Sequence, residues 1–245
     1  MMKEKKPLLR IEQMVISYLT RKEWRPLVQD VSFSLSPGEI LALVGPSGCG
    51  KSLTAQAIVG LLEPGFRVTR GHFYYQDTNI SQYNEKEWQR LRREEIALLV
   101  QDSLSSLNPI RTVKSQMVET INLRKKGTKG DVESYLCSLL SQVGFTHPEE
   151  ILISYPFELS GGMRQRVLLA MMLSLQPKIL IADEPTTALD IINRERVWSL
   201  FKKLRQDFNL AILLISHDKA SVQRIADRAI EMSPGGRCHE LTGVT

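Results

Sequence analysis

Eight residues that follow an apolar run have the types and spacing of a phosphate-binding loop. They fit the pattern G-x-x-x-x-G-K-[ST] and are Gly45, Pro46, Ser47, Gly48, Cys49, Gly50, Lys51 and Ser52. Glycines let the backbone approach phosphate oxygens closely, so that its N–H groups form a nest for the anion. In this pattern Lys51 reaches the β- and γ-phosphates, and the Ser52 hydroxyl is a ligand of Mg²⁺. The spacing predicts a site for a nucleoside triphosphate and Mg²⁺.

Two carboxylates follow a second apolar run. Residues 179–182 are all apolar, and Asp183 and Glu184 come directly after them. A phosphate-binding loop of this kind needs a carboxylate in the metal shell and a group that polarises the attacking water. We assign the metal to Asp183 and the general base to Glu184. Together with the loop, these acids predict a nucleoside triphosphatase or a kinase.

The segments around these residues alternate between strand and helix patterns. Short, fully apolar runs are typical of strands buried on both faces, and they lie at 40–44, 96–100, 179–182 and 211–215. Helical patterns lie near 51–62, 162–175 and 191–207. Further strands are predicted at 8–17, at 28–36 and on both sides of the turn Pro234-Gly235-Gly236. This order predicts an α/β fold whose core sheet is mainly parallel and covered on both faces, with an antiparallel β part near the N-terminus.

The middle of the chain differs from the rest. Two helical patterns, at 112–124 and 131–143, occur there without a strand pattern. We therefore expect one domain over 1–245, with a core formed by about 1–102 and 159–245. A helical subdomain is inserted at about 103–158 and continues into the next helix, to about 175.

Composition sets outer limits on function. The 245 residues are 42% apolar and carry a net charge of +5, which excludes a disordered chain and permits an anionic partner without choosing one. The three cysteines have no close spacing, so neither a disulfide framework nor a CxxC zinc site is indicated. No apolar run approaches the roughly 18 residues of a membrane span, and no signal peptide is recognised. We expect a cytosolic protein that meets a membrane only through a partner.

A third motif is far more specific. The segment Leu159–Met163, called here the signature segment, reads Leu-Ser-Gly-Gly-Met and opens a predicted helix. The Ser160 hydroxyl and the free N–H groups at Gly161 and Gly162 would face outward at the positive end of that helix, as a second phosphate-binding surface. Here the chain resembles the ATP-binding subunits of ATP-binding-cassette (ABC) transporters over essentially its whole length. The family usually has glutamine where this chain has Met163, and methionine is similar to the peptide and nickel importer branch.

The resemblance implies how the site is completed. Two ATPase subunits bind head to tail, with each ATP held between the phosphate-binding loop of one and the signature segment of the other. Gln101 resembles the glutamine that contacts Mg²⁺ and the attacking water. His217 resembles the histidine that contacts the γ-phosphate. The full set of implied nucleotide-contacting residues is Tyr18, Gly45, Pro46, Ser47, Gly48, Cys49, Gly50, Lys51, Ser52, Leu53, Ser160, Gly161, Gly162 and Asp190. Tyr18 is placed there as the aromatic ring that stacks on adenine, and Trp24 is the alternative.

The resemblance also implies cofactors, partners and location. ATP and Mg²⁺ are the cofactors. The partners are a second ATPase subunit (a related chain or a second copy), two integral membrane permease subunits and, indirectly, an extracytoplasmic substrate-binding protein. Nucleic acid is not expected as a partner. The subunit would lie on the cytoplasmic face of the plasma or inner membrane.

Two alternatives remain open on the sequence. A non-transport ABC ATPase that acts on nucleic acid or the ribosome is disfavoured, because 132 positions from Lys51 to Asp183 leave no room for long coiled-coil arms and there is one cassette. The cargo is the second question. The segments 101–109 and 155–158 resemble importers of the peptide/nickel group. With 28 residues after His217, the chain is similar to the shorter nickel or metal-chelate subunits, so we favour that cargo over peptides.

Overall fold

The core of the fold is a six-stranded sheet. The computed structural model describes residues 6–100, 106–122, 131–186 and 191–241. The sheet has the order β10-β9-β3-β8-β7-β6, and its strands are β3 (Ile40–Val44), β6 (Ile96–Leu99), β7 (Ile179–Asp183), β8 (Ala211–Ser216), β9 (Arg228–Met232) and β10 (Cys238–Leu241). All neighbouring pairs are parallel except the edge pair β9–β10. Every residue of β3, β7 and β8 is buried, which explains the apolar runs at 40–44, 179–182 and 211–215.

A second, antiparallel sheet is formed mostly by the N-terminal part of the chain. Its order is β2-β1-β4-β5, with β1 (Leu9–Leu19), β2 (Trp24–Leu35), β4 (Phe66–Tyr75) and β5 (Thr78–Asn79). The two strands predicted at 8–17 and 28–36 are confirmed, whereas β4 was not predicted. Its central residues alternate little in hydropathy. At Gly71 in β4 a β-carbon would lie 2.6 Å from the Glu12 carbonyl oxygen, so glycine is required beside the irregular part of β1.

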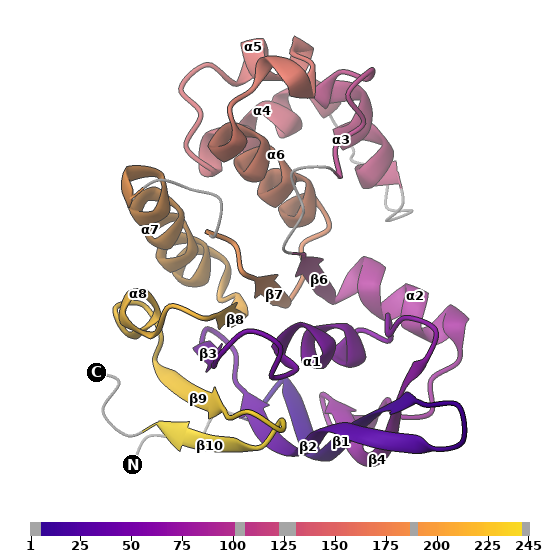
Figure 1. Ribbon diagram of the computed structural model, residues 1–245. Helices are drawn as coiled ribbons and strands as arrows, with labels where there is room; N and C mark the ends of the chain where they lie inside the picture. Colours follow the sequence, from indigo (N-terminus) through magenta and orange to yellow (C-terminus); the bar gives the residue numbers. More distant parts are fainter. Residues whose placement is uncertain (1–5, 101–105, 123–130, 187–190, 242–245) are drawn as a thin grey trace.

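Helices cover the core sheet on both faces, as predicted. Helix α1 (Lys51–Ile58) lies between the two sheets, and α2 (Glu85–Glu94) packs near β6 (Figure 1). On β3 the side chains of Leu41 and Leu43 face the α1 side, whereas those at 40, 42 and 44 face α7 (Ile191–Phe208) and the other helices. Helix α8 (Lys219–Gln223) follows β8. Helix α1 ends at Ile58 rather than near 62, because the chain turns at Gly60 with a φ of +66°.

The remaining helices gather at the end of the molecule opposite the antiparallel sheet (Figure 1). They are α3 (Val113–Asn122), α4 (Val132–Gln142), α5 (Pro148–Ile153), the short 3₁₀ helix η2 (Pro156–Glu158) and α6 (Gly161–Ser174). The patterns at 112–124, 131–143 and 162–175 therefore mark real helices, while α5 was not predicted. Described residues between 106 and 158 contain no strand. The apolar faces of these helices join the core on the α7 side of the sheet.

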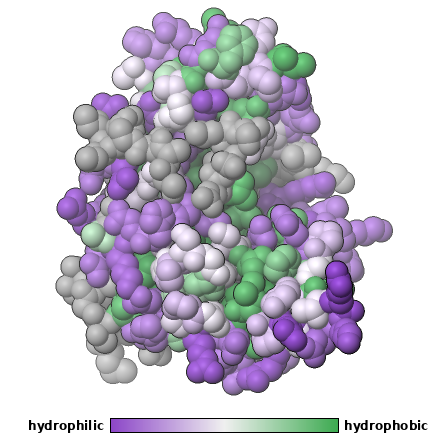
Figure 2. All heavy atoms as spheres, viewed as in Figure 1, coloured by the Kyte–Doolittle hydropathy of each residue, from purple (hydrophilic) through white to green (hydrophobic). Residues whose placement is uncertain are grey.

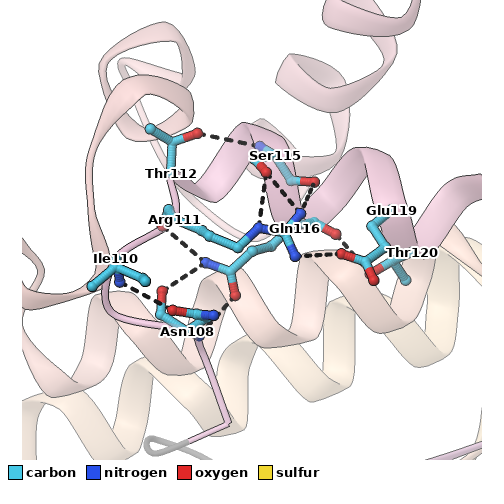
Figure 3. A network of polar contacts seen from close by, with 8 residues as sticks. All are labelled: Asn108, Ile110, Arg111, Thr112, Ser115, Gln116, Glu119 and Thr120. Atoms are coloured by element: carbon cyan, nitrogen blue, oxygen red, sulfur yellow. Dashed lines mark hydrogen bonds and ion pairs between the residues drawn. The ribbon is translucent and has the colours of Figure 1, made fainter.

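A polar network fixes the loop that leads into α3 (Figure 3). The buried Gln116 carboxamide accepts the Asn108 N–H at 2.9 Å and donates to the carbonyls of Asn108 and Arg111 at 3.1 and 3.0 Å. The Arg111 guanidinium donates to the Ser115 hydroxyl and pairs with Glu119 at 2.5 Å. Since both ends of the loop are bound to one helix, the loop is held in one conformation.

Candidate functional site: an ATP-binding site

The loop Gly45–Ser52, called here the nucleotide loop, leaves the buried strand β3 and enters α1. Gly45, Gly48 and Gly50 have φ angles of +156°, +79° and +108°. A β-carbon on Gly45 would lie 2.3 Å from the Met232 carbonyl oxygen, and one on Gly50 would lie 2.3 Å from a methyl carbon of Val28. Both positions therefore require glycine, because L side chains avoid these angles and no space exists for them.

The ammonium group of Lys51 is held over this loop. The residue is only 6% exposed, and Nζ donates to the carbonyl oxygens of Gly45 and Pro46, both at 2.9 Å. An ammonium has three N–H donors, so one remains for an anion. Leu53, in the first turn of α1, is partly buried and packs against the core between the two sheets.

Asp183 ends β7 beside Ser52. Its side chain is buried, and burial raises the pKa of its carboxyl group, while a hydrogen bond from the Ser52 hydroxyl opposes this shift. Among the described residues, Oδ1 of Asp183 is buried without a hydrogen-bond partner. Buried carboxylate oxygens normally accept a hydrogen bond or bind a cation, so Oδ1 of Asp183 indicates a binding position for a ligand. Hard divalent cations take carboxylate and hydroxyl oxygens, and this pair of side chains fits Mg²⁺.

At Glu184 the backbone leaves the extended conformation of β7. Its φ is +51°, a left-handed value for a residue with a side chain, and its N–H donates to the Ile215 carbonyl on β8 at 3.0 Å. Nδ1 of His217 lies 2.7 and 2.9 Å from the two carboxylate oxygens of Glu184. The Glu184 side chain is only 10% exposed, whereas the imidazole is half exposed. The structure thus brings together two of the predicted catalytic residues, from the ends of adjacent strands.

The signature segment lies at the start of α6. Ser160 caps the helix: its Oγ accepts the Met163 N–H at 3.3 Å and its carbonyl accepts the Arg164 N–H. Gly161 and Gly162 form the first helical positions, where N–H groups have no intrahelical acceptor. Ser160 itself is exposed. The helix end is therefore capped from within but open to an anion from outside.

Gln165, one turn further along α6, is a residue whose contact sequence reasoning missed. It is buried, and its side-chain amide donates to the Pro185 carbonyl, one residue after Glu184. A glutamine on an apolar helix face gives no sign of its partner in the sequence. The bond joins the signature helix to the segment that carries the two acids.

Strand register separates the two candidates for the adenine-stacking ring. Tyr18 lies on the same face of β1 as Ile16, because alternate residues of a strand share a face. Ile16 is paired with Val28, whose side chain touches the backbone at Gly50. Trp24 is paired with Leu19 and so lies on the opposite face, with a guanidinium 4.0 Å above its ring. The geometry favours Tyr18, on the side of the nucleotide loop.

Two predicted site residues, Gln101 and Asp190, lie outside the described residues. Their assigned contacts with Mg²⁺, water and nucleotide remain predictions. The fold and the site together define a P-loop nucleoside triphosphatase with a second phosphate-facing helix end.

Comparisons with known proteins identify the family. The family model described as ABC transporter matches residues 28–187. The oligopeptide transport ATP-binding protein AppD of Bacillus subtilis is 41% identical over 229 residues, which cover 93% of this chain and 70% of AppD. The metal-staphylopine import system ATP-binding protein CntD of Staphylococcus aureus is 38% identical over 211 residues, covering 86% and 78%.

A solved structure agrees with this result. The ATP-binding cassette MJ0796, seen as a dimer in a post-hydrolysis state with ADP and Pi, superposes with a TM-score of 0.78 at 25% identity. The match covers 96% of this chain and 99% of MJ0796. The chain belongs to the ABC transporter family and is an ATP-binding ATPase of it. Within its described residues, no helix has the length and apolar character of a membrane span.

Proposed function

We propose that this chain is the ATP-hydrolysing subunit of a membrane importer for nickel or other metal chelates, or for di- and oligopeptides. The observation that carries the proposal is the presence of two phosphate-facing regions in one chain. One is the nucleotide loop with its two neighbouring acids, and the other is the exposed, capped helix end at Ser160. A kinase or simple triphosphatase needs the first region only, whereas a head-to-tail ATPase pair needs both.

The residues around the nucleotide have distinct roles in binding and hydrolysis. The nucleotide loop binds the phosphates through its N–H groups, and Lys51 donates to the β- and γ-phosphates. Ser52 and Asp183 would hold Mg²⁺, and the bound ion would supply positive charge next to the phosphates. Glu184 accepts the proton of the attacking water. His217 contacts both carboxylate oxygens of Glu184 and so fixes their direction before ATP binds.

The signature segment acts on the nucleotide of another subunit. Its hydroxyl and helix N–H groups add donors to the γ-phosphate, so that ATP holds two subunits together. The Gln165–Pro185 hydrogen bond supports a link between this event and the acids, because movement of α6 displaces the backbone next to Glu184.

An apolar surface on the helical part supports contact with a membrane partner. Ile110, Ile153 and Phe157 are 82%, 71% and 70% exposed, and the Phe157 ring stacks on Tyr155. Apolar residues show at this end of the molecule in Figure 2. Ile110 lies in the loop that is held in place by hydrogen bonds of Gln116 with Asn108 and Arg111. We assign this surface to a permease subunit, met from the cytoplasmic side, because large exposed apolar side chains gather at interaction sites.

Copurification tests the transport proposal directly. The tagged chain is isolated from detergent-solubilised membranes, and bound proteins and nucleic acids are identified. We expect two integral membrane proteins and an ATPase subunit in fixed ratio. Recovery of ribosomes or DNA in their place would overturn transport and support the non-transport alternative.

Uptake measurements then distinguish the cargoes. CntD is named for metal-staphylopine import and AppD for oligopeptide transport, and both are similar to this chain. In a strain that lacks this gene we expect reduced uptake of a labelled transition-metal chelate, with peptide uptake retained. Loss of peptide uptake alone would assign the peptide cargo and reject the nickel preference.

A further inference from the structure

A cleft of about 960 Å³ lies between the end of α4, the middle of α6 and α7. These three helices lie side by side in Figure 1. The cleft is separate from the nucleotide loop and the signature segment, since none of their residues line it. The polar residues that line it are Gln142, Thr146, Arg166, Glu195, Arg196, Ser199 and Lys203.

The α7 wall of the cleft is cationic. Arg196, Ser199 and Lys203 follow one another at helical spacing of three and four residues, so they share one face of α7. Arg196 and Lys203 are exposed and have no carboxylate partner within the described chain. Glu195 also lines the cleft, but it pairs with Arg224 at 3.3 Å. The excess charge on this wall is therefore positive.

The opposite wall holds a fixed guanidinium. Arg166 of α6 lies 4.3 Å above the Phe145 ring and donates to the Gly144 carbonyl at 2.9 Å. Burial and the nearby Arg196 guanidinium lower the pKa of Arg166. Two guanidinium groups that repel each other across a cleft form a site for an anion, which removes the repulsion and accepts hydrogen bonds from both.

The cleft also presents neutral hydroxyl groups. Thr146 and Ser199 line it and are exposed, and each hydroxyl can both donate and accept a hydrogen bond. A ligand that carries hydroxyl groups as well as negative charge therefore matches more of this lining than a small inorganic anion does.

We propose that this cleft binds a small phosphorylated polyol with two phosphate groups, such as a sugar bisphosphate. One phosphate lies between Arg166 and Arg196, and the other lies at Lys203. Lys203 lies seven positions after Arg196 on the helix, which is a rise of about 10 Å and calls for an extended ligand. The hydroxyl groups of the ligand form hydrogen bonds with Thr146 and Ser199. This binding requires neither a transporter partner nor hydrolysis.

Such a ligand would bridge the helical part and α7. Because α6 also carries the signature segment and the bond from Gln165 to Pro185, a ligand on Arg166 restrains the helix that joins both nucleotide-facing regions. The site would therefore make ATP turnover sensitive to the supply of a phosphorylated metabolite, without contact with ATP.

Calorimetry on the purified full chain tests the site. The Glu184→Gln variant is saturated with MgATP, so that the nucleotide loop is filled, and fructose 1,6-bisphosphate is titrated as the probe. We expect one saturable site per chain. Arg196→Glu and Lys203→Glu should each weaken binding about tenfold or more, since each reverses a phosphate contact. Lys202→Glu is the matched control: the residue is exposed on the same helix, does not line the cleft, and changes charge equally.

Each outcome decides the proposal. Absence of saturable binding would overturn it, and so would equal weakening by Lys203→Glu and Lys202→Glu. Inorganic phosphate is the second probe, and we expect it to bind at least about tenfold more weakly than the bisphosphate. Equal affinities would reject the two-phosphate ligand. Unchanged MgATP affinity in the cleft variants shows that the fold is intact.

Discussion

The base of the nucleotide loop is packed into the core, whereas the signature segment lies at an exposed helix end. In the loop Lys51 is buried and bonded to two carbonyls, and the glycines at 45 and 50 leave no space for a β-carbon, while the tip at residues 46–48 is exposed. In the signature segment Ser160 is exposed, and its hydrogen bonds to described residues lie within its own helix end. Both regions present N–H groups to an anion, but only the first is anchored in the core.

This difference separates what one chain completes from what it leaves to a partner. Ser52 ends the loop, and Asp183 and Glu184 lie near it, so one chain contains all the metal ligands and the general base that we propose. The signature segment, in the same proposal, acts on a nucleotide bound to another chain. Substitutions in the first region should therefore alter the isolated chain, and those in the second should alter only the assembled ATPase.

The largest effect is expected for Glu184→Gln. Loss of the general base should lower ATP hydrolysis by about 10²- to 10⁴-fold, while MgATP still binds and still drives association of subunits. Steady-state phosphate release and nucleotide titration measure the two quantities. Glu231→Gln, on β9 of the same sheet, is the control and should hydrolyse normally. Wild-type hydrolysis by Glu184→Gln with its partner subunit would show that the assignment is wrong.

The next effect tests how closely the base of the loop packs against its neighbours. Gly50→Ala places a β-carbon 2.3 Å from Val28 at a φ of +108°, so we expect a loss of about 2–4 kcal/mol in unfolding free energy and weak MgATP binding. Gly65→Ala is matched, with a φ of +96° and no atom within 4 Å. It should cost about 1 kcal/mol and leave nucleotide affinity unchanged. Urea denaturation gives both values, and equal losses would contradict the steric argument.

A smaller loss of ATP hydrolysis, confined to the assembled ATPase, is expected for Ser160→Arg. The exposed position tolerates the side chain, so the isolated chain should bind MgATP with wild-type affinity. Hydrolysis by the assembled ATPase should fall about 10- to 100-fold, because the added bulk blocks the facing phosphate. Reduced nucleotide affinity in the isolated chain would show that the two regions do not divide their roles as proposed.

The smallest effect concerns the buried carboxylate. The pKa of Asp183 is raised in the folded chain, so this group stabilises the fold fully below its ordinary pKa and that contribution is lost as pH rises through the raised value. At pH 7 the nucleotide-free Asp183→Asn variant should therefore melt at a higher temperature than wild type. The difference should shrink as pH falls toward 4, and MgATP should stabilise the variant less. A variant that melts lower at pH 7 would contradict this account.

Sequence patterns predicted most of the fold for identifiable reasons. The apolar runs at β3, β7 and β8 have only one environment that suits them, a sheet buried on both faces. Strand β4 was missed because its central residues are largely exposed and include Gly71. Glycine is required at this position because the backbone of β1 leaves no space for a β-carbon, and the sequence does not reveal that contact. Helix α5 was missed because six residues are too few for a helical period to show.

The site was predictable where a motif fixes residue types at fixed spacing. The nucleotide loop, Asp183 and the Ser160 cap follow from local chemistry and occupy the expected elements. The contact of His217 with Glu184 forms because β7 and β8 are neighbours in the sheet. The sequence shows both residues but does not show that these two strands are adjacent. Gln165 had no motif role at all, and the cleft between α4, α6 and α7 exists only once the helices are packed.

The central claim is that one chain binds ATP at its nucleotide loop and uses its signature segment to hold the ATP of another. Sedimentation of Glu184→Gln with and without MgATP, alone and mixed with the ATPase subunit recovered from membranes, tests it most directly. We predict an assembly of two cassettes that forms with MgATP, disperses without it, and fails to form when Ser160→Arg is added. A single cassette at saturating MgATP in both preparations would contradict the claim.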